Sequence, residues 1–245
     1  FPGDFIAQTL EDSNIQSDFV QVDEDTRINV KLKSGQETEI NAPGPKVTHA
    51  QFEQLLSQIR RTTNDDIVIV AGSVPNSIPS DAYAQIAQIT EKTGAQLVVD
   101  AEKDLVETVL PYRPLFIKPN KDELEVMFNT TVKSDEDVIK YGNEILKKGA
   151  QSVIISLGGD GAIYVDQHQS IKAVNPQGHV VNTVGSGDST VAGMVAGLSM
   201  GLNVDEAFQQ AVASGTATAF SEDLATRDAI ENIKSQVTIS VLDGE

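Results

Sequence analysis

The chain has no cysteine and no tryptophan, only three histidines, and half as many basic as acidic residues. Without cysteine there is no disulfide framework, no thiol nucleophile and no cysteine-based zinc site. Lysine and arginine number 18 against 36 aspartates and glutamates, so the formal net charge is −18. Nucleic acid and anionic membranes attract clustered lysine and arginine, and we expect neither as a partner. The negative net charge is still compatible with binding of a small phosphorylated ligand, because such a ligand needs only a few local hydrogen-bond donors.

Long apolar runs and several common catalytic motifs are also missing. The most apolar stretch, residues 191–202, is too short and too rich in glycine to cross a membrane. No signal peptide is visible, so we expect a cytoplasmic protein. The chain has neither a Gly-x-x-x-x-Gly-Lys-[Ser/Thr] loop nor a Gly-x-Ser-x-Gly elbow, which disfavours P-loop kinases and α/β-hydrolases. His49, His168 and His179 lie outside every motif described below and are expected at the surface.

Strand-like and helix-like segments alternate over most of the chain. Apolar runs at residues 67–70, 96–99, 115–117 and 153–157 are separated by amphipathic segments. Continuous apolar runs are typical of strands that are covered on both faces. The order therefore predicts an α/β fold with a doubly wound, mostly parallel sheet.

Residues 18–45 have a different character. Short strands are predicted at 19–22, 26–32 and 37–40, and polar and apolar side chains alternate in the second of them. We expect a small β-sheet lid over 18–45, projecting from a main domain made of residues 1–17 and 46–245. The alternative is an ordinary edge extension of the main sheet.

Polar loops follow the predicted strands. They are Ala71–Pro75, Asp100, Lys118–Asn120, Ser156–Gly161 and Gly185–Asp188. Ligands bind at the carboxyl ends of strands in such sheets, so these loops are expected to meet at one edge. Two roles are open for Asp100: it can belong to the groups around a bound metal ion, or it can cap the N-terminus of a helix.

The last of these loops carries the most specific chemistry. Gly185, Ser186 and Gly187 are small enough for backbone N–H groups to converge on an anion, and a helix-like stretch follows. Asp188 comes next, so a carboxylate lies beside the anion cradle. This arrangement suits phosphoryl transfer to a hydroxyl, in which the cradle stabilises charge and the carboxylate takes the proton. The alternative is a plain glycine-rich turn with Asp188 as a first-turn helix charge.

Together these motifs resemble the PfkB, or ribokinase-like, family of sugar kinases over essentially the whole chain. Gly185–Asp188 is similar to its Gly-Ala-Gly-Asp turn, with serine in the middle. Asn120–Glu123 matches its Asn-x-x-Glu motif, Ser156–Gly161 its Ser-Leu-Gly-x-x-Gly loop, and Gly72–Pro75 its Gly-Ser-x-Pro motif. Residues 182–190 look most like the 1-phosphofructokinase members.

The resemblance implies an ATP-dependent phosphorylation of a phosphohexose. Fructose 1-phosphate is the first candidate, with tagatose 6-phosphate and fructose 6-phosphate as alternatives, and a non-catalytic binding protein as a rival of another class. Asp188 would be the general base on the bound sugar, and Gly185, Ser186 and Gly187 would form the anion hole. The nucleotide would be bound by Ser156, Gly158, Gly159, Asp160, Gly161, Lys118, Asn120 and Gly187. The Ser156–Gly161 loop can also form a hairpin turn before the next strand, and this structural role is compatible with nucleotide binding.

The resemblance also implies a magnesium site. Glu123 and Asn120 would hold Mg²⁺ through water, because this ion keeps much of its hydration shell. A surface pair at a helix start, with asparagine as N-cap, is the alternative.

Sugar-phosphate binding would involve the lid. Arg27, Asn29 and Lys31 share one strand face and would grip the phosphate already on the sugar. Ser73 would hydrogen-bond the sugar. The alternative is that these side chains simply face solvent on a strand and bind no ligand.

Two further expectations follow from the resemblance. The family forms homodimers through the lid, so a homodimer is expected. The family's first signature, a Gly-Gly-Lys-Gly-x-Asn-like loop after a strand with a sugar-binding Asp, is not in these 245 residues, and Phe1–Ile6 resembles the segment that follows it. We therefore expect residues before Phe1 in the native chain.

Overall fold

The computed structural model describes residues 2–34 and 36–242, without the side chains of residues 31, 33, 34 and 36–39. Its elements are α1 (Pro2–Asp12), β1 (Asn29–Ser34), β2 (Gln36–Asn41), α2 (His49–Ile59), β3 (Ile67–Ala71), α3 (Ala82–Thr93), β4 (Gln96–Asp100), α4 (Lys103–Val109), η1 (Leu110–Tyr112), β5 (Phe116–Ile117), α5 (Lys121–Phe128), α6 (Asp135–Lys148), β6 (Ser152–Ser156), η2 (Gly158–Asp160), β7 (Ala162–Asp166), β8 (Ser170–Val174), α7 (Ser186–Ser199), α8 (Val204–Ala219), α9 (Arg227–Lys234) and β9 (Thr238–Leu242).

The described strands form a seven-stranded sheet in the order β3-β4-β5-β6-β7-β8-β9 and a separate two-stranded sheet, β1-β2. Strands β3 to β6 pair in parallel, as the alternating strand and helix pattern predicts. Strands β7, β8 and β9 extend the sheet by antiparallel pairing. The predicted α/β fold with a mostly parallel sheet and a small β unit is therefore confirmed.

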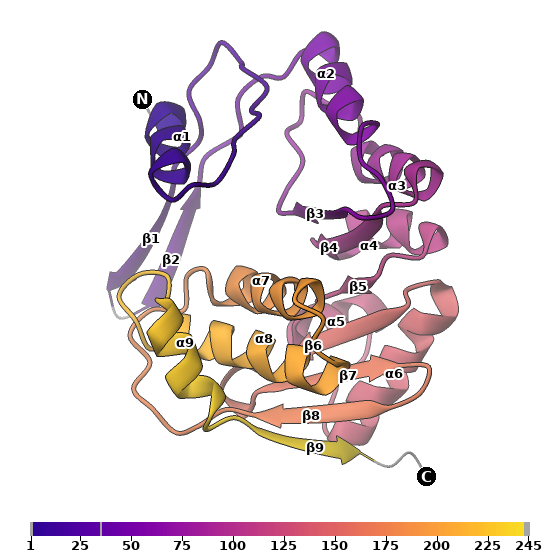
Figure 1. Cartoon of the computed structure of the whole chain (residues 1–245), viewed down its shortest axis with the longest axis vertical. Helices are drawn as coiled ribbons and strands as arrows, with labels where there is room; N and C mark the ends of the chain where they lie inside the picture. The colour runs from indigo at the N-terminus through magenta and orange to yellow at the C-terminus, as the bar shows by residue number, and fades with distance from the viewer. Residues whose placement is uncertain (1, 35, 243–245) are drawn as a thin grey trace.

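Helices cover both faces of the large sheet, so the main body has three layers (Figure 1). On β4, Val99 packs into a core with residues of α2 to α6, whereas Val98 packs into a second core with α7, α8 and α9. Both side chains are fully buried. Successive strand residues point to opposite faces, and this explains why apolar residues run continuously along the central strands.

Strand β3 is an exception to that rule. Its apolar run predicted burial on both faces, but Ile69 is 46% exposed and the strand lies at the edge of the described sheet. The prediction was wrong for this strand because Ile69 packs into neither of the two cores.

The helix ends follow the expected capping chemistry in most cases. Ser134 and Thr226 accept hydrogen bonds from the third residues of α6 and α9, and Gly94 ends α3 in the left-handed conformation. Asp81 is the N-cap residue of α3, and its side chain makes no capping hydrogen bond. Helix α1 has no buried residue and has no counterpart among the predicted elements.

Helices α7 and α8 pack unusually closely. A Cβ on Gly193 would lie 2.9 Å from the Cα of Ala211, and one on Gly197 would lie 2.8 Å from the Cα of Ala207. Only glycine lets the two backbones approach this far. The close contact fixes the position of α7, whose first turn carries the predicted catalytic loop.

Strands β1 and β2 form the projecting hairpin that the sequence predicts for the lid (Figure 1). The predicted strand at residues 19–22 is absent from the structure, and β1 begins only at Asn29. Instead, the segment before β1 is bound to α2 through side chains. Gln51 and Gln58 donate hydrogen bonds to the backbone carbonyls of Gln21 and Asp18. Backbone groups satisfied in this way need no strand partner.

Candidate active site

The N-terminus of α7 is built by a left-handed glycine. Gly185 is the N-cap residue with φ 78°, and Ser186 is the first helical residue. Asp188 therefore lies in the first turn of the helix, where its side chain is exposed to solvent. A residue with a side chain is strained at this φ, so the turn requires glycine here.

Backbone donors are available at this turn. The Ser186 N–H donates to the Thr183 carbonyl at 3.2 Å, whereas the N–H groups of Gly185 and Gly187 make no hydrogen bond within the described residues. Free N–H groups and the helix dipole at this end both favour an anion. The start of α7 thus offers free backbone donors beside the Asp188 carboxylate, and we refer to this turn as the anion cradle.

A buried ion pair lies against this cradle. The Lys118 Nζ is 3.2 Å from Oδ1 of Asp100, and only 7% of the lysine side chain is exposed. Lys118 follows β5 and Asp100 ends β4, so neighbouring parallel strands bring the two residues together. A Cβ placed on Gly187 would be 3.3 Å from the Lys118 Nζ. Lys118 is therefore neither exposed nor isolated.

Burial shifts the pKa of the Asp100 carboxyl upward. The dominant cause is desolvation, the Lys118 ammonium opposes it, and the charge of Asp188 adds to it. Asp100 is also not a helix N-cap, because Glu102 holds that position for α4. Asp100 and Asp188 are thus close enough for their charges to interact.

The Asn-x-x-Glu motif forms a complete capping box at the start of α5. The Asn120 Oδ1 accepts from the Glu123 N–H, and the Glu123 Oε2 accepts from the Asn120 N–H, both at 2.8 Å. The two side chains are thus held rigidly at the carboxyl end of β5. The second carboxylate oxygen of Glu123 is not part of the box.

A cleft of about 510 Å³ opens between the loop after β6 and the start of α7. The predicted residues that line it are Asn120, Ser156, Gly158, Gly159, Gly161, Ser186 and Gly187. Asp160 and Lys118 are not among its lining residues, although Asp160 belongs to the short helix η2 of the same loop. The cleft falls within the range of small-molecule and cofactor sites.

Asn175, Thr216 and Phe220 are among the lining residues of this cleft that sequence reasoning missed. The Asn175 Nδ2 donates to the Gly158 carbonyl at 3.0 Å, and its Oδ1 accepts from the Thr216 hydroxyl at 2.9 Å. Asn175 therefore ties the loop after β6 to α8. Its position in an Asn-Pro pair directly after β8 was the available signal.

A second cavity of about 610 Å³ lies between the lid segment and the loop after β3. Arg27 and Ser73 line it as expected, together with Lys46 and Asn76, which the sequence did not single out. Asn29 is exposed at the start of β1 and does not line the cavity. The side chain of Lys31 lies outside the described residues.

The family can now be assigned. The model of the pfkB family carbohydrate kinases matches residues 1–229. The chain belongs to this family. It is therefore a carbohydrate kinase, an enzyme that transfers a phosphoryl group to a hydroxyl.

Curated relatives of this pfkB kinase cover nearly its whole length. A 1-phosphofructokinase of Bacillus subtilis is 40% identical over 242 residues, which is 99% of this chain and 80% of the relative. A D-tagatose-1-phosphate kinase of Bacillus licheniformis is 35% identical over 243 residues, again 99% of this chain and 80% of the relative.

Solved structures agree with the family assignment. A Staphylococcus aureus crystal structure, provisionally named a phosphofructokinase, is 80% identical with a TM-score of 0.91, covering 100% of this chain and 80% of that chain. Phosphofructokinase-2 from Escherichia coli, crystallised with substrates and products, is 27% identical with a TM-score of 0.89, covering 96% and 78%.

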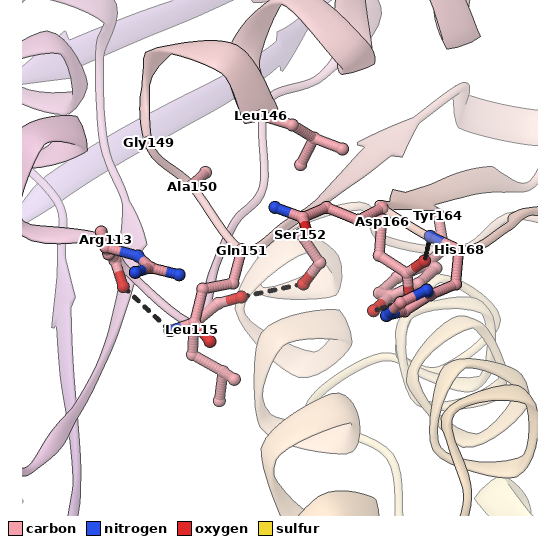
Figure 2. Close-up of a pocket in the computed structure, with 11 residues that line it drawn as sticks. Arg113, Leu115, Leu146, Gly149, Ala150, Gln151, Ser152, Tyr164, Asp166 and His168 are labelled. Atoms are coloured by element: carbon pink, nitrogen blue, oxygen red, sulfur yellow. Dashed lines mark hydrogen bonds between the residues drawn. The ribbon is translucent and has the colours of Figure 1, made fainter.

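The pfkB kinase has another hollow, of about 380 Å³, away from the motif loops (Figure 2). Arg113, Ser152 and His168 are among its lining residues, and Figure 2 shows them around the start of β6 and the β7–β8 turn. His49, His168 and His179 are all exposed, as expected. Across residues 2–34 and 36–242, no cluster of three metal-ligating side chains occurs, and no helix has the length and apolarity needed to cross a membrane.

Proposed function

We propose that this kinase transfers the γ-phosphoryl group of ATP to fructose 1-phosphate, forming fructose 1,6-bisphosphate. The observation that carries the proposal is the position of Asp188, in the first turn of α7 beside the free N–H groups of Gly185 and Gly187. The names of the relatives support the substrate, since those at 40% and 34% identity are 1-phosphofructokinases.

In the proposed step, a sugar hydroxyl oxygen attacks the γ-phosphorus of ATP. The bond between that phosphorus and the β–γ bridging oxygen breaks, and its electron pair leaves on ADP. The hydroxyl proton passes to the Asp188 carboxylate. The free N–H groups of Gly185 and Gly187, together with the α7 dipole, stabilise the negative charge on the transferred group.

The nucleotide would occupy the cleft lined by the loop after β6. Asn175 fixes that loop through the Gly158 carbonyl, so the backbone surface offered to ATP is held in place. Phe220, which also lines the cleft, offers an apolar surface for the base.

Magnesium fits the residues at the start of α5. The capping box occupies one carboxylate oxygen of Glu123 and leaves the other for a hydrated ion. Mg²⁺ commonly uses one or two carboxylates plus substrate phosphates and keeps several waters. When bound, the ion would neutralise charge on the ATP phosphates.

The phosphate already carried by the sugar would bind in the second cavity. Arg27 and Lys46 supply two positive charges there, and Ser73 supplies a hydroxyl for the sugar. The Glu24 Oε2 accepts a hydrogen bond from the Lys46 N–H at 2.7 Å, so the lid segment and the turn before α2 are joined at this point. Asn29 and Lys31 remain candidates on the lid strand.

A homodimer through the lid is also proposed, with the cytoplasm as its location. Ile28, Val30, Leu32 and Ile40 are between 42% and 63% exposed, an apolar surface around the hairpin that a second copy can cover. Light scattering after gel filtration tests the dimer, and a monomer at micromolar concentration contradicts it.

The substrate is tested by ATP consumption in magnesium with four acceptors side by side. These are fructose 1-phosphate, fructose 6-phosphate, tagatose 6-phosphate and tagatose 1-phosphate, the last because of the 35% identical relative. We expect the highest kcat/KM with fructose 1-phosphate. A preference for another acceptor overturns the substrate assignment. Nucleotide binding without turnover on any acceptor favours a non-catalytic binding protein.

A further inference from the structure

Asp100 has a geometric role that the motifs do not assign. Its side chain is 18% exposed, and its Oδ1 lies 3.2 Å from the Lys118 Nζ. The ion pair joins the carboxyl ends of β4 and β5, between the loop after β3 and the N-terminus of α7. Within the described part of the chain, Asp100 is the only acidic partner of Lys118.

The position of the lysine ammonium matters for the chemistry. A Cβ on Gly187 would approach the Lys118 Nζ to 3.3 Å, so the ammonium lies close to the backbone of the anion cradle. A lysine side chain has four rotatable carbon–carbon bonds and no preferred direction of its own. A fixed partner is therefore needed to keep the ammonium at the cradle when no phosphate is bound.

A buried carboxylate is a strong fixed partner. If one member of a buried ion pair moves away, the other charge is left unpaired and poorly solvated, which costs free energy. The two groups therefore keep each other in position. The Asp100 backbone is fixed as well, because its carbonyl accepts the Gly72 N–H at 3.0 Å. The carboxylate thus has little freedom to follow a moving lysine.

We propose that Asp100 is a positioning residue that holds the Lys118 ammonium against Gly187, where the transferred phosphoryl group passes. Asp100 acts through Lys118 and makes no contact with the substrate. The inference rests on the proposed function, since it concerns the same phosphoryl site. Direct ligation of magnesium by Asp100 is the competing role.

A double-mutant cycle separates these roles. The variants are Asp100→Asn, Lys118→Met and the combination, with kcat, KM for ATP and the magnesium requirement measured for each. Contacting charged residues commonly couple by several-fold to about a hundredfold. We expect Asp100→Asn to lower kcat by about tenfold in the parent enzyme and by less than about twofold in the Lys118→Met background. The magnesium concentration for half-maximal rate should stay unchanged.

Two results overturn the proposal. In the first, the fold-losses in kcat of the two single variants multiply in the double variant, and Asp100→Asn raises the magnesium requirement. Asp100 is then a metal ligand. If kcat falls equally in both backgrounds together with the melting temperature, its role is merely structural. Asp100→Glu, which restores the carboxylate, should recover part of kcat. Asp104→Asn, an exposed carboxylate on α4, is the matched control and should behave like the parent.

The experiment also keeps this proposal separate from the proposed function. If the parent enzyme phosphorylates none of the sugar phosphates, the proposed function fails before the cycle is begun. If the parent is active and the two substitutions do not couple, only the positioning role of Asp100 fails.

Discussion

The hydroxyl of Tyr83 donates a hydrogen bond to the carbonyl oxygen of Gly72 at 2.7 Å. Tyr83 is only 4% exposed, and Gly72 adopts a left-handed conformation with φ 83° directly before Ser73. A helix side chain from α3 therefore holds the loop that carries the proposed sugar ligand. Burial, with the nearby charge of Asp100, raises the pKa of Tyr83 to about 12.

Removing this hydroxyl should weaken the fold and change its pH dependence. Tyr83→Phe leaves the Gly72 carbonyl without its donor, and we expect about 1–2 kcal/mol less stability at neutral pH. In the unfolded chain the tyrosine loses its proton near pH 10, whereas in the folded protein it keeps the proton up to about pH 12. The contribution of Tyr83 to the free energy of unfolding is therefore lost as the pH rises from 10 to 12.

Urea unfolding of both proteins from pH 8 to 12 measures this effect. The stability difference between parent and Tyr83→Phe should shrink in the upper part of that range. A difference that stays constant up to pH 12 contradicts the raised pKa of Tyr83. A higher KM for the sugar phosphate in the variant would further link the hydrogen bond to Ser73.

Asp188 should be needed for turnover and not for binding. Asp188→Ala removes the proposed proton acceptor, and we expect kcat to fall by at least about a hundredfold, the usual scale for loss of a general base. The affinity for nucleotide, measured by calorimetry, should change little.

The matched control for Asp188 is Asp228→Ala. Asp228 is likewise an exposed aspartate in the first turn of a helix, α9, and its removal should leave kcat unchanged. A loss below about tenfold in Asp188→Ala is too small for a general base and removes that role.

Arg27 and Lys46 should act on the phosphosugar alone. Either substitution to alanine removes a cation from the second cavity, and a lost charge-assisted hydrogen bond corresponds to about a 10- to 100-fold rise in KM for the sugar phosphate. The KM for ATP should stay within about twofold if the two cavities bind separate substrates. Equal changes in both KM values contradict a role in recognising the sugar phosphate.

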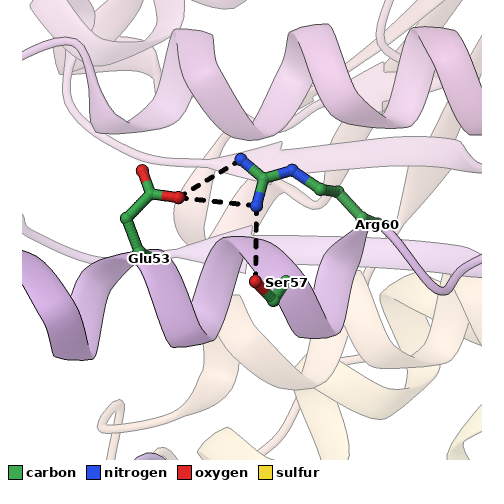
Figure 3. Close-up of polar contacts among 3 residues, drawn as sticks. All are labelled: Glu53, Ser57 and Arg60. Atoms are coloured by element: carbon green, nitrogen blue, oxygen red, sulfur yellow. Dashed lines mark hydrogen bonds and ion pairs between the residues drawn. The ribbon is translucent and has the colours of Figure 1, made fainter.

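Arg60 provides the control cation. It lies at the end of α2, where its guanidinium contacts Glu53 and Ser57 at 3.4–3.5 Å (Figure 3). Both charged side chains are more than 40% exposed, so the pair adds at most about 1 kcal/mol to stability. Arg60→Ala should leave both KM values unchanged.

Local patterns predicted the central strands of the sheet well. The strands β4 and β6 are buried, and their continuous apolar residues make this burial visible in the sequence. The segment before β1 was mispredicted because its backbone partners are the Gln51 and Gln58 side chains, about 30 and 40 residues further along. Side-chain partners at that separation leave no periodic signal.

Among the candidate site residues, those that are contiguous in sequence could be predicted, and those that meet only in the folded structure could not. Gly185–Asp188 could be found because its glycines and aspartate are consecutive, whereas Lys46 and Asn175 join the site only through the folding of distant loops. The Asp100–Lys118 contact needed the strand order, since it depends on β4 and β5 being neighbours. Individual roles at these positions stay predictions until the variants are measured.

The packing of α7 on α8 should tolerate no added methyl group at Gly215. A Cβ there would collide with the Thr190 Oγ1 and lie 2.9 Å from the Ser186 carbonyl, at the start of α7. We expect Gly215→Ala to lower stability by about 1–3 kcal/mol, the usual scale for overpacking. Thermal unfolding measures this, and an unchanged melting temperature contradicts the close packing. The exposed Gly159→Ala, with nothing within 4 Å, is the control for stability.

Two of the capping boxes in the described residues pair an asparagine with a glutamate, and one of these two lies at the proposed magnesium site. Asn120 and Glu123 cap α5, and Asn203 and Glu206 cap α8 in the same reciprocal arrangement. Glutamine keeps a carbonyl oxygen for the cap but removes the charge, so Glu123→Gln and Glu206→Gln should each lower stability by less than about 1 kcal/mol.

Their effects on catalysis should differ, because a hydrated Mg²⁺ needs the carboxylate charge. We expect Glu123→Gln to raise the magnesium concentration for half-maximal rate by about tenfold or more, and Glu206→Gln to leave it unchanged. A magnesium titration of ATP turnover for the three proteins measures this. If both variants match the parent, Glu123 serves only as the N-terminal cap of α5, and the magnesium ion must be held by other groups, including the phosphates of ATP itself.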